Sequence, residues 1–307
     1  MHSKIESLKT ELHKAIIGQE EMIEGLIIGL LCDGHILVEG VPGLAKTSTI
    51  NALSKAISLD SKRIQFTPDL LPSDIIGTQI YNPKEHSFSI KKGVLFTNLL
   101  LADEINRAPA KVQSALLEVM QERQITIAEE RFKLDPPFLV MATQNPIEQE
   151  GVYPLPEAQL DRFMMKIAVE HNSEDEELEI MRKASSKSFE KVEAVLSVDE
   201  LFELQKEITQ VHIDEALERY MVQLITATRK EHDDIMFGAS PRASIDLYKA
   251  SKAKAFLRGN DFVTPADIGS VIHAVLRHRV VLSYEARAKG VKVDEIVSKI
   301  LETIPIP

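Results

Sequence analysis

One short stretch constrains this chain more than any other, a glycine loop set between an apolar run and a segment with helical periodicity. The loop reads Gly40-Val41-Pro42-Gly43-Leu44-Ala45-Lys46-Thr47. The apolar run before it is Ile36–Val38, and the helical segment after it extends from Thr47 to Ile57. In such a strand, loop and helix, the loop N–H groups and the positive end of the helix face one point. The stretch is therefore typical of a phosphate-binding site.

The loop follows the Walker A pattern G-x-x-x-x-G-K-[ST] with one departure, because Ala45 stands in place of the last glycine. Lys46 is expected to reach the β- and γ-phosphates of ATP, and the Thr47 hydroxyl is expected to ligate Mg²⁺. Ala45 fits if its backbone has right-handed helical angles, where a Cβ costs little. A tight turn before a surface helix is the alternative. The expected nucleotide-binding residues of this loop are Gly40, Pro42, Gly43, Leu44, Ala45, Lys46, Thr47 and Ser48.

The composition limits the class of protein. The 307 residues suit one large domain and a smaller one. The charged (27%) and hydrophobic (44%) fractions are usual for a soluble globular protein, and no apolar run approaches the ~20 residues of a membrane helix. The first residues contain no apolar signal region. The one cysteine, Cys32, cannot form a disulfide within the chain, so we expect a small buried hydrophobe in a cytoplasmic protein.

A second apolar run, Leu99–Ala102, ends in two carboxylates, Asp103 and Glu104. This is the form of a buried parallel strand that delivers acids to the carboxyl edge of a sheet, as in a Walker B motif. Asp103 is expected to hold Mg²⁺ through its water shell, and Glu104 is expected to orient or deprotonate the attacking water. Without the glycine loop, a strand followed by an exposed acidic turn would be the better interpretation.

Another buried strand, Phe138–Thr143, ends at Gln144-Asn145-Pro146. A polar amide at the end of a strand beside Asp103 could contact the γ-phosphate or the lytic water, so Asn145 is predicted to act as sensor 1. Asn-Pro is also an ordinary start of a turn, which is the alternative.

The remaining first half of the chain contains predicted helices, strands and hairpins. Helices are expected over residues 3–16, 19–33 and from 109 to about 124, and strands over 63–66 and 164–169. A structured loop covers 67–77. Two hairpins are predicted, one pairing 79–81 with 88–90 and the other pairing 125–127 with 132–134. The first of these hairpins is expected to project from the body.

Two arginines are candidates for catalysis. A short helix at 156–163 ends in Asp161-Arg162-Phe163, and Arg162 could reach a nucleotide bound by a neighbouring subunit. A structural ion pair with Asp161 or another acid is the alternative. Arg242 stands at a helix start, where the helix dipole disfavours a cation. That position suggests a ligand, so Arg242 is predicted to be sensor 2, reaching back to the nucleotide.

Beyond residue 172, the strand pattern gives way to helical periodicity. Helices are predicted over residues 174–183, 198–209, 216–229, 243–257, 265–276 and 293–300. We therefore expect an α/β nucleotide-binding domain over 1–172 and a smaller, all-helical domain over 173–307.

Together these residues resemble the AAA+ ATPases, and specifically the MoxR family, over nearly the whole chain. Ala45 is common in that family. The most specific matching segments are the loop at 40–47, Arg63-Ile64-Gln65-Phe66-Thr67-Pro68-Asp69-Leu70-Leu71-Pro72-Ser73-Asp74, Asp103-Glu104-Ile105-Asn106-Arg107-Ala108 and Tyr153-Pro154-Leu155-Pro156-Glu157-Ala158-Gln159-Leu160-Asp161-Arg162-Phe163.

The resemblance implies a fold, a cofactor set and partners. It implies an αβα sandwich with a central parallel sheet, a helical lid, and hydrolysis of ATP with Mg²⁺ at the interfaces of a homo-hexameric ring. Related ATPases place a main-chain contact to adenine at the turn that contains Gly18 and Gln19, although the spacing alone indicates only a turn between helices. Family members act as chaperone-like remodellers in the maturation of other proteins, often with von Willebrand factor A-domain partners.

Three functions remain open on the sequence. The first is an ATPase that remodels or activates another protein, and the second is an AAA+ motor that acts on nucleic acid. The net charge of −11 and the absence of tryptophan count against the motor, although a local basic patch is possible. The third is a nucleotide-regulated binding module, which would need neither Glu104 nor Arg162.

Overall fold

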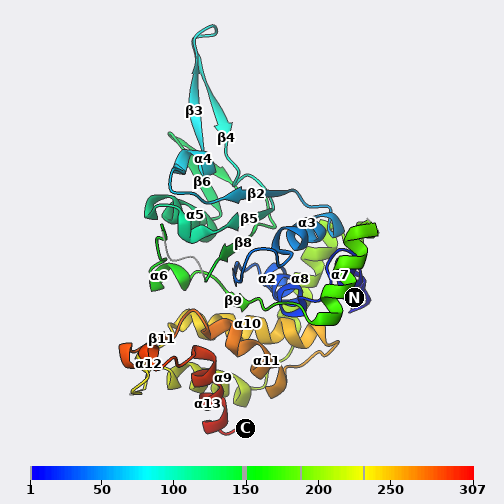
Figure 1. Cartoon of the computed structure of the whole chain (residues 1–307), viewed down its shortest axis with the longest axis vertical. Helices are drawn as coiled ribbons and strands as arrows, with labels where there is room; N and C mark the ends of the chain where they lie inside the picture. Colours follow the sequence, from blue (N-terminus) through cyan, green and yellow to red (C-terminus); the bar gives the residue numbers. More distant parts are fainter. Residues whose placement is uncertain (1, 147–150, 187–188, 231) are drawn as a thin grey trace.

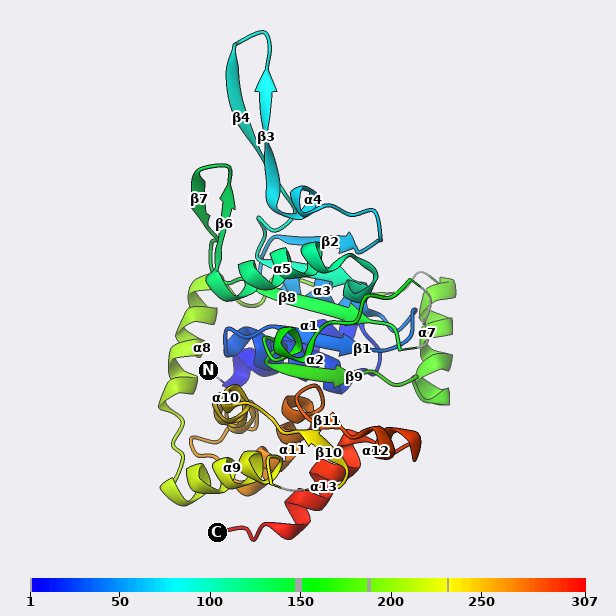
Figure 2. The same cartoon turned by 90° about the vertical axis from the view of Figure 1, so that its left-hand side faces the viewer.

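The computed structural model describes residues 2–146, 151–186, 189–230 and 232–307, and it is built around one parallel sheet (Figures 1 and 2). The helices are α1 (His2–Ala15), α2 (Glu20–Leu31), α3 (Lys46–Ala56), α4 (Pro72–Ile76), α5 (Ala110–Glu122), α6 (Glu157–Leu160), α7 (Glu174–Ser186), α8 (Val198–Gln210), α9 (Glu215–Ala227), α10 (Pro241–Leu257), α11 (Pro265–Leu276), α12 (Tyr284–Ala288) and α13 (Val293–Thr303). The strands are β1 (Ile36–Glu39), β2 (Ser61–Gln65), β3 (Gly77–Asn82), β4 (Ser87–Lys92), β5 (Leu99–Asp103), β6 (Gln124–Ile127), β7 (Glu130–Lys133), β8 (Leu139–Gln144), β9 (Met165–Ala168), β10 (Ile235–Phe237) and β11 (Val281–Leu282).

Five parallel strands form the central sheet in the order β2-β5-β8-β1-β9. Alternate residues of β5 belong to different cores, because the side chains of a strand point to opposite faces. Leu99 and Leu101 pack in the cluster that contains α1, α2 and α3, whereas Leu100 and Ala102 pack in the cluster that contains α5. Burial on both faces explains the unbroken apolar run that predicted this strand, and the αβα sandwich is confirmed.

The parallel arrangement gives the sheet two chemically distinct edges. At the carboxyl edge, the glycine loop follows β1, Asp103 ends β5 and Asn145 follows β8. At the amino edge, His35 precedes β1 and the segment 162–164 precedes β9. With four residues in β1, each rising about 3.3 Å, the two edges lie about 13 Å apart.

The second body is helical as predicted, except for one antiparallel ribbon made of β10 and β11. Strands of three and two residues are too short to show an alternating pattern, so the periodicity did not reveal them. The short α12 was not predicted either. Among the residues that the structure describes, no helix is long and apolar enough to cross a membrane.

Helices α7 and α8 fall inside the predicted lid, but they lie beside the sheet layer in Figure 2. The α8 residue Gln205 donates to the α2 carbonyl of Leu30 at 2.8 Å, and Lys4 of α1 pairs with Glu200 of α8 at 2.7 Å. The division at residue 173 therefore stays a prediction. One buried apolar cluster also runs from α1 and α2 into α9, α10 and α11, so the two bodies share a core.

Three consecutive residues after α11 fasten the lid to the segment before and within β9. Arg277 Nη1 donates to the Lys166 carbonyl at 2.9 Å, and His278 Nε2 donates to the Phe163 carbonyl at 2.9 Å. Arg279 is only 1% exposed, and its guanidinium donates to the carbonyls of Asp161, Phe163 and Met164 at 3.2, 2.8 and 3.1 Å. We call these three residues the lid clamp.

Two hairpins project from the end of the molecule opposite the lid, as Figures 1 and 2 show. The hairpin β3–β4 carries a cross-strand aromatic pair, Tyr81 and Phe88, with ring centroids 5.1 Å apart. At its base, the Lys92 ammonium lies over Phe96 and over Phe132 of the second hairpin, at 4.8 and 5.7 Å. The two predicted hairpins are therefore confirmed, and they contact each other through this cation–π cluster.

His35 is a buried polar group that the sheet keeps neutral. Its Nε2 donates to the Met120 carbonyl at 3.0 Å, and its Nδ1 accepts the Val140 N–H at 3.0 Å. Burial, and secondarily the charge of Arg123, lower the pKa of His35 to about 3. Protonation of Nδ1 would also remove the acceptor that Val140 needs.

We predict that His35 makes the protein sensitive to acid. Below the ordinary histidine pKa of about 6.5, the unfolded chain takes up a proton at this residue and the folded chain does not. The free energy of unfolding should fall by up to about 1.4 kcal/mol per pH unit between pH 6.5 and 3. Urea denaturation at pH 7, 6 and 5 should show a shallower loss in His35→Gln than in a His171→Gln control on the surface. Equal slopes in the two variants would contradict this assignment.

Candidate functional site

A cavity of about 350 Å³ opens at the carboxyl edge of the sheet, and it collects side chains from four separate elements. The residues that line it are Pro42, Gly43, Ala45, Lys46, Thr47, Ser48, Arg63, Gln65, Asp103, Glu104 and Asn145. The structure therefore brings together nine of the residues that the sequence predicted, from motifs far apart in the chain. Arg63 and Gln65 were not predicted.

The glycine loop has a strained backbone, and the expectation for Ala45 was wrong. Ala45 has φ 53° and ψ 13°, in the left-handed region rather than the right-handed one. This conformation costs a residue with a Cβ roughly 1–2 kcal/mol, so the position favours glycine. Gly43 has φ +93° and needs to be glycine for the same reason. Such strain is common where a loop is shaped for a ligand.

Two predicted loop residues have structural contacts. A Cβ at Gly40 would meet Val169 Cβ at 3.0 Å, so the glycine allows the loop to pass close to the chain after β9. Leu44 is buried beside Gly40 and packs inward. Neither residue lines the cavity, although Gly40 contributes its carbonyl to Lys46.

Lys46 supplies positive charge to the cavity. Its Nζ donates to the Gly40 carbonyl at 2.6 Å. Burial lowers the pKa of Lys46, and the negative charges of Asp103 and Glu104 oppose that shift. This half-buried ammonium can bind phosphate oxygens, and the two acids beside it can hold a metal ion.

The two carboxylates at the end of β5 are held in different ways. Asp103 Oδ1 accepts from the Thr143 hydroxyl at 2.6 Å, and the same hydroxyl accepts the Glu104 N–H at 2.9 Å. Glu104 has φ 55° and ψ 51°, so this acid also stands in the left-handed region. Glu104 Oε2 accepts from Gln65 Nε2 at 2.6 Å and from Arg107 Nη1 at 3.0 Å.

The edge strand β2 contributes the side chains that sequence reasoning missed. Gln65 is the register partner of Asp103, which places it beside both acids. Arg63 Nη2 and Nε lie 2.7 and 3.2 Å from Asp103 Oδ2. One sequence signal could have identified them. Arg63 and Gln65 are two residues apart near the end of the predicted strand 63–66, so their side chains lie on the same face of that strand.

The oxygen atoms in this cavity fit Mg²⁺. The Thr47 hydroxyl and the Asp103 carboxylate face one space, and both are hard oxygen ligands. Mg²⁺ in nucleotide sites takes one or two protein ligands and completes its shell with water and phosphate, so this small donor set is sufficient. Asn145 is 7% exposed and lines the same cavity, and its role as sensor 1 stays a prediction.

The turn between α1 and α2 lies outside this cavity. Gln19 Nε2 donates to Glu170 O and Asn172 Oδ1, both at 3.1 Å, and Asn172 Nδ2 donates to the Ile17 carbonyl at 3.0 Å. Gly18 has φ +65° and adjoins Asn172 and Glu176. The turn is thus tied to the chain that leaves the carboxyl edge after β9, and the adenine contact of Gly18 and Gln19 stays a prediction.

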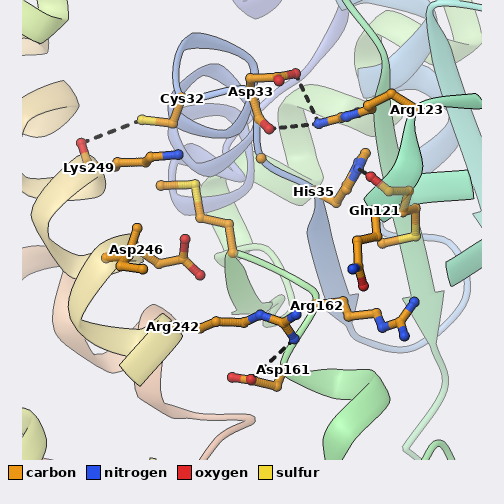
Figure 3. Close-up of a pocket in the computed structure, with 14 residues that line it drawn as sticks. Cys32, Asp33, His35, Gln121, Arg123, Asp161, Arg162, Arg242, Asp246 and Lys249 are labelled. Carbon is orange, nitrogen blue, oxygen red and sulfur yellow. Dashed lines mark hydrogen bonds and ion pairs between the residues drawn. The ribbon is translucent and has the colours of Figure 1, made fainter. Parts of the chain in front are cut away.

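The two predicted arginines lie at the opposite edge of the sheet. Arg162 and Arg242 line a second cavity of about 380 Å³, together with residues 32–35 that precede β1 (Figure 3). Arg242 Nη1 lies 3.5 Å from Asp161 Oδ2. Arg162 points away from Asp161 in Figure 3, and its Nη1 donates to the Leu117 carbonyl at 2.8 Å. The structure does not bring Arg242 back to the glycine loop of its own chain.

Cys32 also lies in the second cavity, at the end of α2. Its thiol donates to the Lys249 carbonyl at 3.5 Å (Figure 3). Burial raises the pKa of Cys32 to about 12. A thiol that stays protonated at neutral pH is a poor nucleophile, so Cys32 has a packing role here.

Known proteins match this chain over its whole length. Residues 35–165 match the ATPase family associated with various cellular activities (AAA), and residues 227–300 match the AAA lid domain. Chaperone MoxR1 of Mycobacterium tuberculosis is 47% identical over 97% of this chain and 81% of its own length. YeaC of Bacillus subtilis, an uncharacterized protein, is 41% identical over 100% and 96%. The crystal structure of a candidate ATPase from Cytophaga hutchinsonii has a TM-score of 0.93 at 50% identity, covering 100% of this chain and 96% of that one.

We predict that Lys46→Ala weakens the binding of ATP. The variant loses a charge-assisted contact to phosphate, which is worth about 1.5–3 kcal/mol, or roughly ten- to a hundredfold in affinity. Calorimetric titration with ATP should show this loss, and a Lys84→Ala control on the projecting hairpin should bind like wild type. Unchanged affinity in Lys46→Ala would remove the phosphate-binding role from this loop.

Proposed function

This chain belongs to the MoxR family of AAA+ ATPases, and from that premise we propose that it hydrolyses ATP with Mg²⁺ in order to remodel or activate another protein. One observation carries the proposal. Lys46, Thr47, Asp103, Glu104 and Asn145 line a single cavity, although they come from three motifs. A protein that only bound nucleotide would need no general base beside its phosphate loop.

Each side chain has a separate task in the proposed reaction. The loop N–H groups and Lys46 bind the β- and γ-phosphates. Thr47 and Asp103 would hold Mg²⁺, whose charge neutralises the phosphate oxygens. Glu104 accepts the proton of the attacking water, and Asn145 orients that water or the γ-phosphate. Gln65 and Arg107 hold the Glu104 carboxylate until the reacting groups are in place.

Arg162 and Arg242 are proposed to act on the nucleotide of a neighbouring subunit. Both line the cavity at the amino edge, which the length of β1, about 13 Å, separates from the carboxyl edge and its glycine loop. An interface that joins the carboxyl edge of one chain to the amino edge of the next would place both arginines beside the neighbour's γ-phosphate. Such a head-to-tail contact is heterologous, and it closes into a ring when its rotation allows. We propose a homo-hexamer, the usual ring of the family.

The partners belong to the same proposal. The relative MoxR1 is named a chaperone, and we propose a chaperone-like role for this chain in the maturation of a client protein. A von Willebrand factor A-domain protein is the proposed partner, and the cytoplasm is the proposed compartment. We do not favour nucleic acid as the substrate, because the net charge of −11 opposes binding to a polyanion.

Measurements of ATP hydrolysis can distinguish a protein remodeller from a nucleic-acid motor and from a regulated binding module. Steady-state hydrolysis of ATP is measured for the protein alone, with single- or double-stranded DNA, and with an added A-domain protein. Stimulation by the A-domain protein and not by DNA supports the remodelling role. Stimulation by DNA alone would favour the motor, and negligible turnover under every condition would favour a regulated binding module.

We predict that Glu104→Gln retains ATP and Mg²⁺ but hydrolyses slowly. The amide has almost the same shape as the carboxylate, but it cannot accept a proton, and loss of a general base typically costs ~10²–10⁴-fold in rate. Nucleotide retention and phosphate release should be measured together, with Glu129→Gln in the second hairpin as the matched control. Turnover within about two- or threefold of wild type would show that another group activates the water. Because it stalls with ATP bound, this variant is also the bait for isolating a client.

We predict that Arg162→Ala binds ATP normally and hydrolyses it poorly. An arginine at the transferring phosphate can be worth ~10³–10⁵-fold in rate, far more than an exposed ion pair. Mixing Arg162→Ala with Lys46→Ala should restore hydrolysis, because the second variant still supplies Arg162 to the intact loop of the first. Arg242→Ala should be rescued in the same way if it acts on the same neighbouring site.

The mixing experiment needs proof that the two variants share rings, for example by pull-down through a tag on one of them. Arg131→Ala, on the second hairpin, serves as a control that should be active without mixing. If mixed rings form and activity does not return, the trans role of Arg162 is wrong. Hydrolysis at the wild-type rate by Arg162→Ala alone would also show that Arg162 has no catalytic role in trans.

A further inference from the structure

Arg63 is a second cation in the nucleotide cavity, and neither Walker motif contains it. It stands on the edge strand β2, and its side chain is 52% exposed while that of Asp103 is 16% exposed. Its Nη2 and Nε lie 2.7 and 3.2 Å from the same oxygen, Asp103 Oδ2. The guanidinium therefore faces the cavity with its charge directed at the carboxylate.

Asp103 has one oxygen facing the protein and one facing the cavity. Its Oδ1 accepts from the Thr143 hydroxyl at 2.6 Å, which fixes the orientation of the carboxylate. Its Oδ2 is the oxygen that Arg63 covers. A metal ion on the open side of Asp103 would compete with the guanidinium for Oδ2, because two cations at the same oxygen repel each other.

The ion pair between Arg63 and Asp103 contributes little to the stability of the sheet. Strands β2 and β5 are already joined through five register pairs, from Ser61 with Leu99 to Gln65 with Asp103. An ion pair with one partner half exposed contributes little to folding. The more informative property is its location, because both partners line the cavity that is formed by the phosphate loop.

We propose that Arg63 is a displaceable counter-charge, which neutralises Asp103 in the metal-free protein and leaves that carboxylate when Mg²⁺ is bound. This inference rests on the proposed function, because it takes Asp103 as the carboxylate that holds the metal. Arg63 lowers the repulsion between the acids and the phosphates of metal-free ATP. By competing for Asp103, it also raises the Mg²⁺ concentration at which the metal strengthens nucleotide binding.

Displacement of Arg63 from Asp103 would also affect Glu104, the proposed general base. Arg63 Nη2 lies 3.1 Å from Gln65 Oε1, and Gln65 Nε2 donates to Glu104 Oε2 at 2.6 Å. Gln65 is thus held from one side by the guanidinium while it holds the Glu104 carboxylate on the other. When the guanidinium leaves Asp103, Gln65 loses that partner and its grip on Glu104 weakens. The metal carboxylate and the base are therefore connected through two side chains of β2.

The test measures the affinity for ATP by calorimetry, once with excess Mg²⁺ and once with EDTA. The full chain is used as wild type, Arg63→Gln, Arg63→Lys and Arg131→Gln, the last being a matched charge change on the second hairpin. In Arg63→Gln, the metal-free affinity should fall about fivefold, the size of an exposed ion pair. The ratio of affinities with and without Mg²⁺ should rise by the same factor, and half-saturation should need less Mg²⁺.

Arg63→Lys should lie between wild type and Arg63→Gln, because it keeps the charge and loses the planar fork. This variant and thermal melting keep the test valid if Arg63→Gln folds poorly. An unchanged ratio in Arg63→Gln would overturn the inference. An equal fall in both affinities would do so too, since Arg63 would then be a direct phosphate contact.

Failure of the proposed function gives a different result. If wild-type affinity does not depend on Mg²⁺, or if Lys46→Ala binds ATP as well as wild type, the site itself is wrong. If both of those controls behave as expected and only the Arg63 ratio is unchanged, the proposed function stands and the counter-charge does not.

Discussion

The parallel direction of five strands is the constraint on which the rest of this structure depends. It sends the loop after β1, the acids at the end of β5 and the amide after β8 to one edge. It sends the segments before β1 and β9 to the other edge, where they meet the helix α10 of the lid. Chemistry that needs both edges therefore has to be shared between chains, which is the physical reason for proposing catalysis at subunit interfaces.

The sequence predicted the carboxyl edge well, because each motif there follows a strand with an unmistakable apolar run. Asp103 and Glu104 stand at the end of the buried strand β5, and Asn145 directly follows the buried strand β8. Their location at the carboxyl edge therefore followed from the fold class. Arg63 and Gln65 were missed because β2 is an edge strand of mixed polarity, which gives no such signal. The backbone of Ala45 was predicted wrongly, since the strain of a loop is set by its closure and not by its composition.

The location of Arg242 could not be predicted from periodicity, which identifies α10 but not where α10 packs. Its position follows from contacts between residues far apart in the chain. Asp161 accepts from the Ser240 hydroxyl at 2.9 and 2.8 Å and from Arg279 Nε at 2.8 Å, and these bonds fix the start of α10 beside the end of α6. Polar contacts of this kind leave no pattern in one sequence, although they decide which site an arginine can serve.

The lid clamp also determines which parts of a chain can move independently. Arg279 and His278 bind the carbonyls on either side of Arg162, and the shared apolar core extends from α2 to α10. A rotation of the lid should therefore move the segment around Arg162 at the amino edge of the sheet. In a closed ring, a change in the orientation of one lid would therefore move Arg162 relative to the nucleotide site of the neighbouring subunit. Since each chain presents Arg162 to one neighbour only, this coupling would run around the ring in one direction.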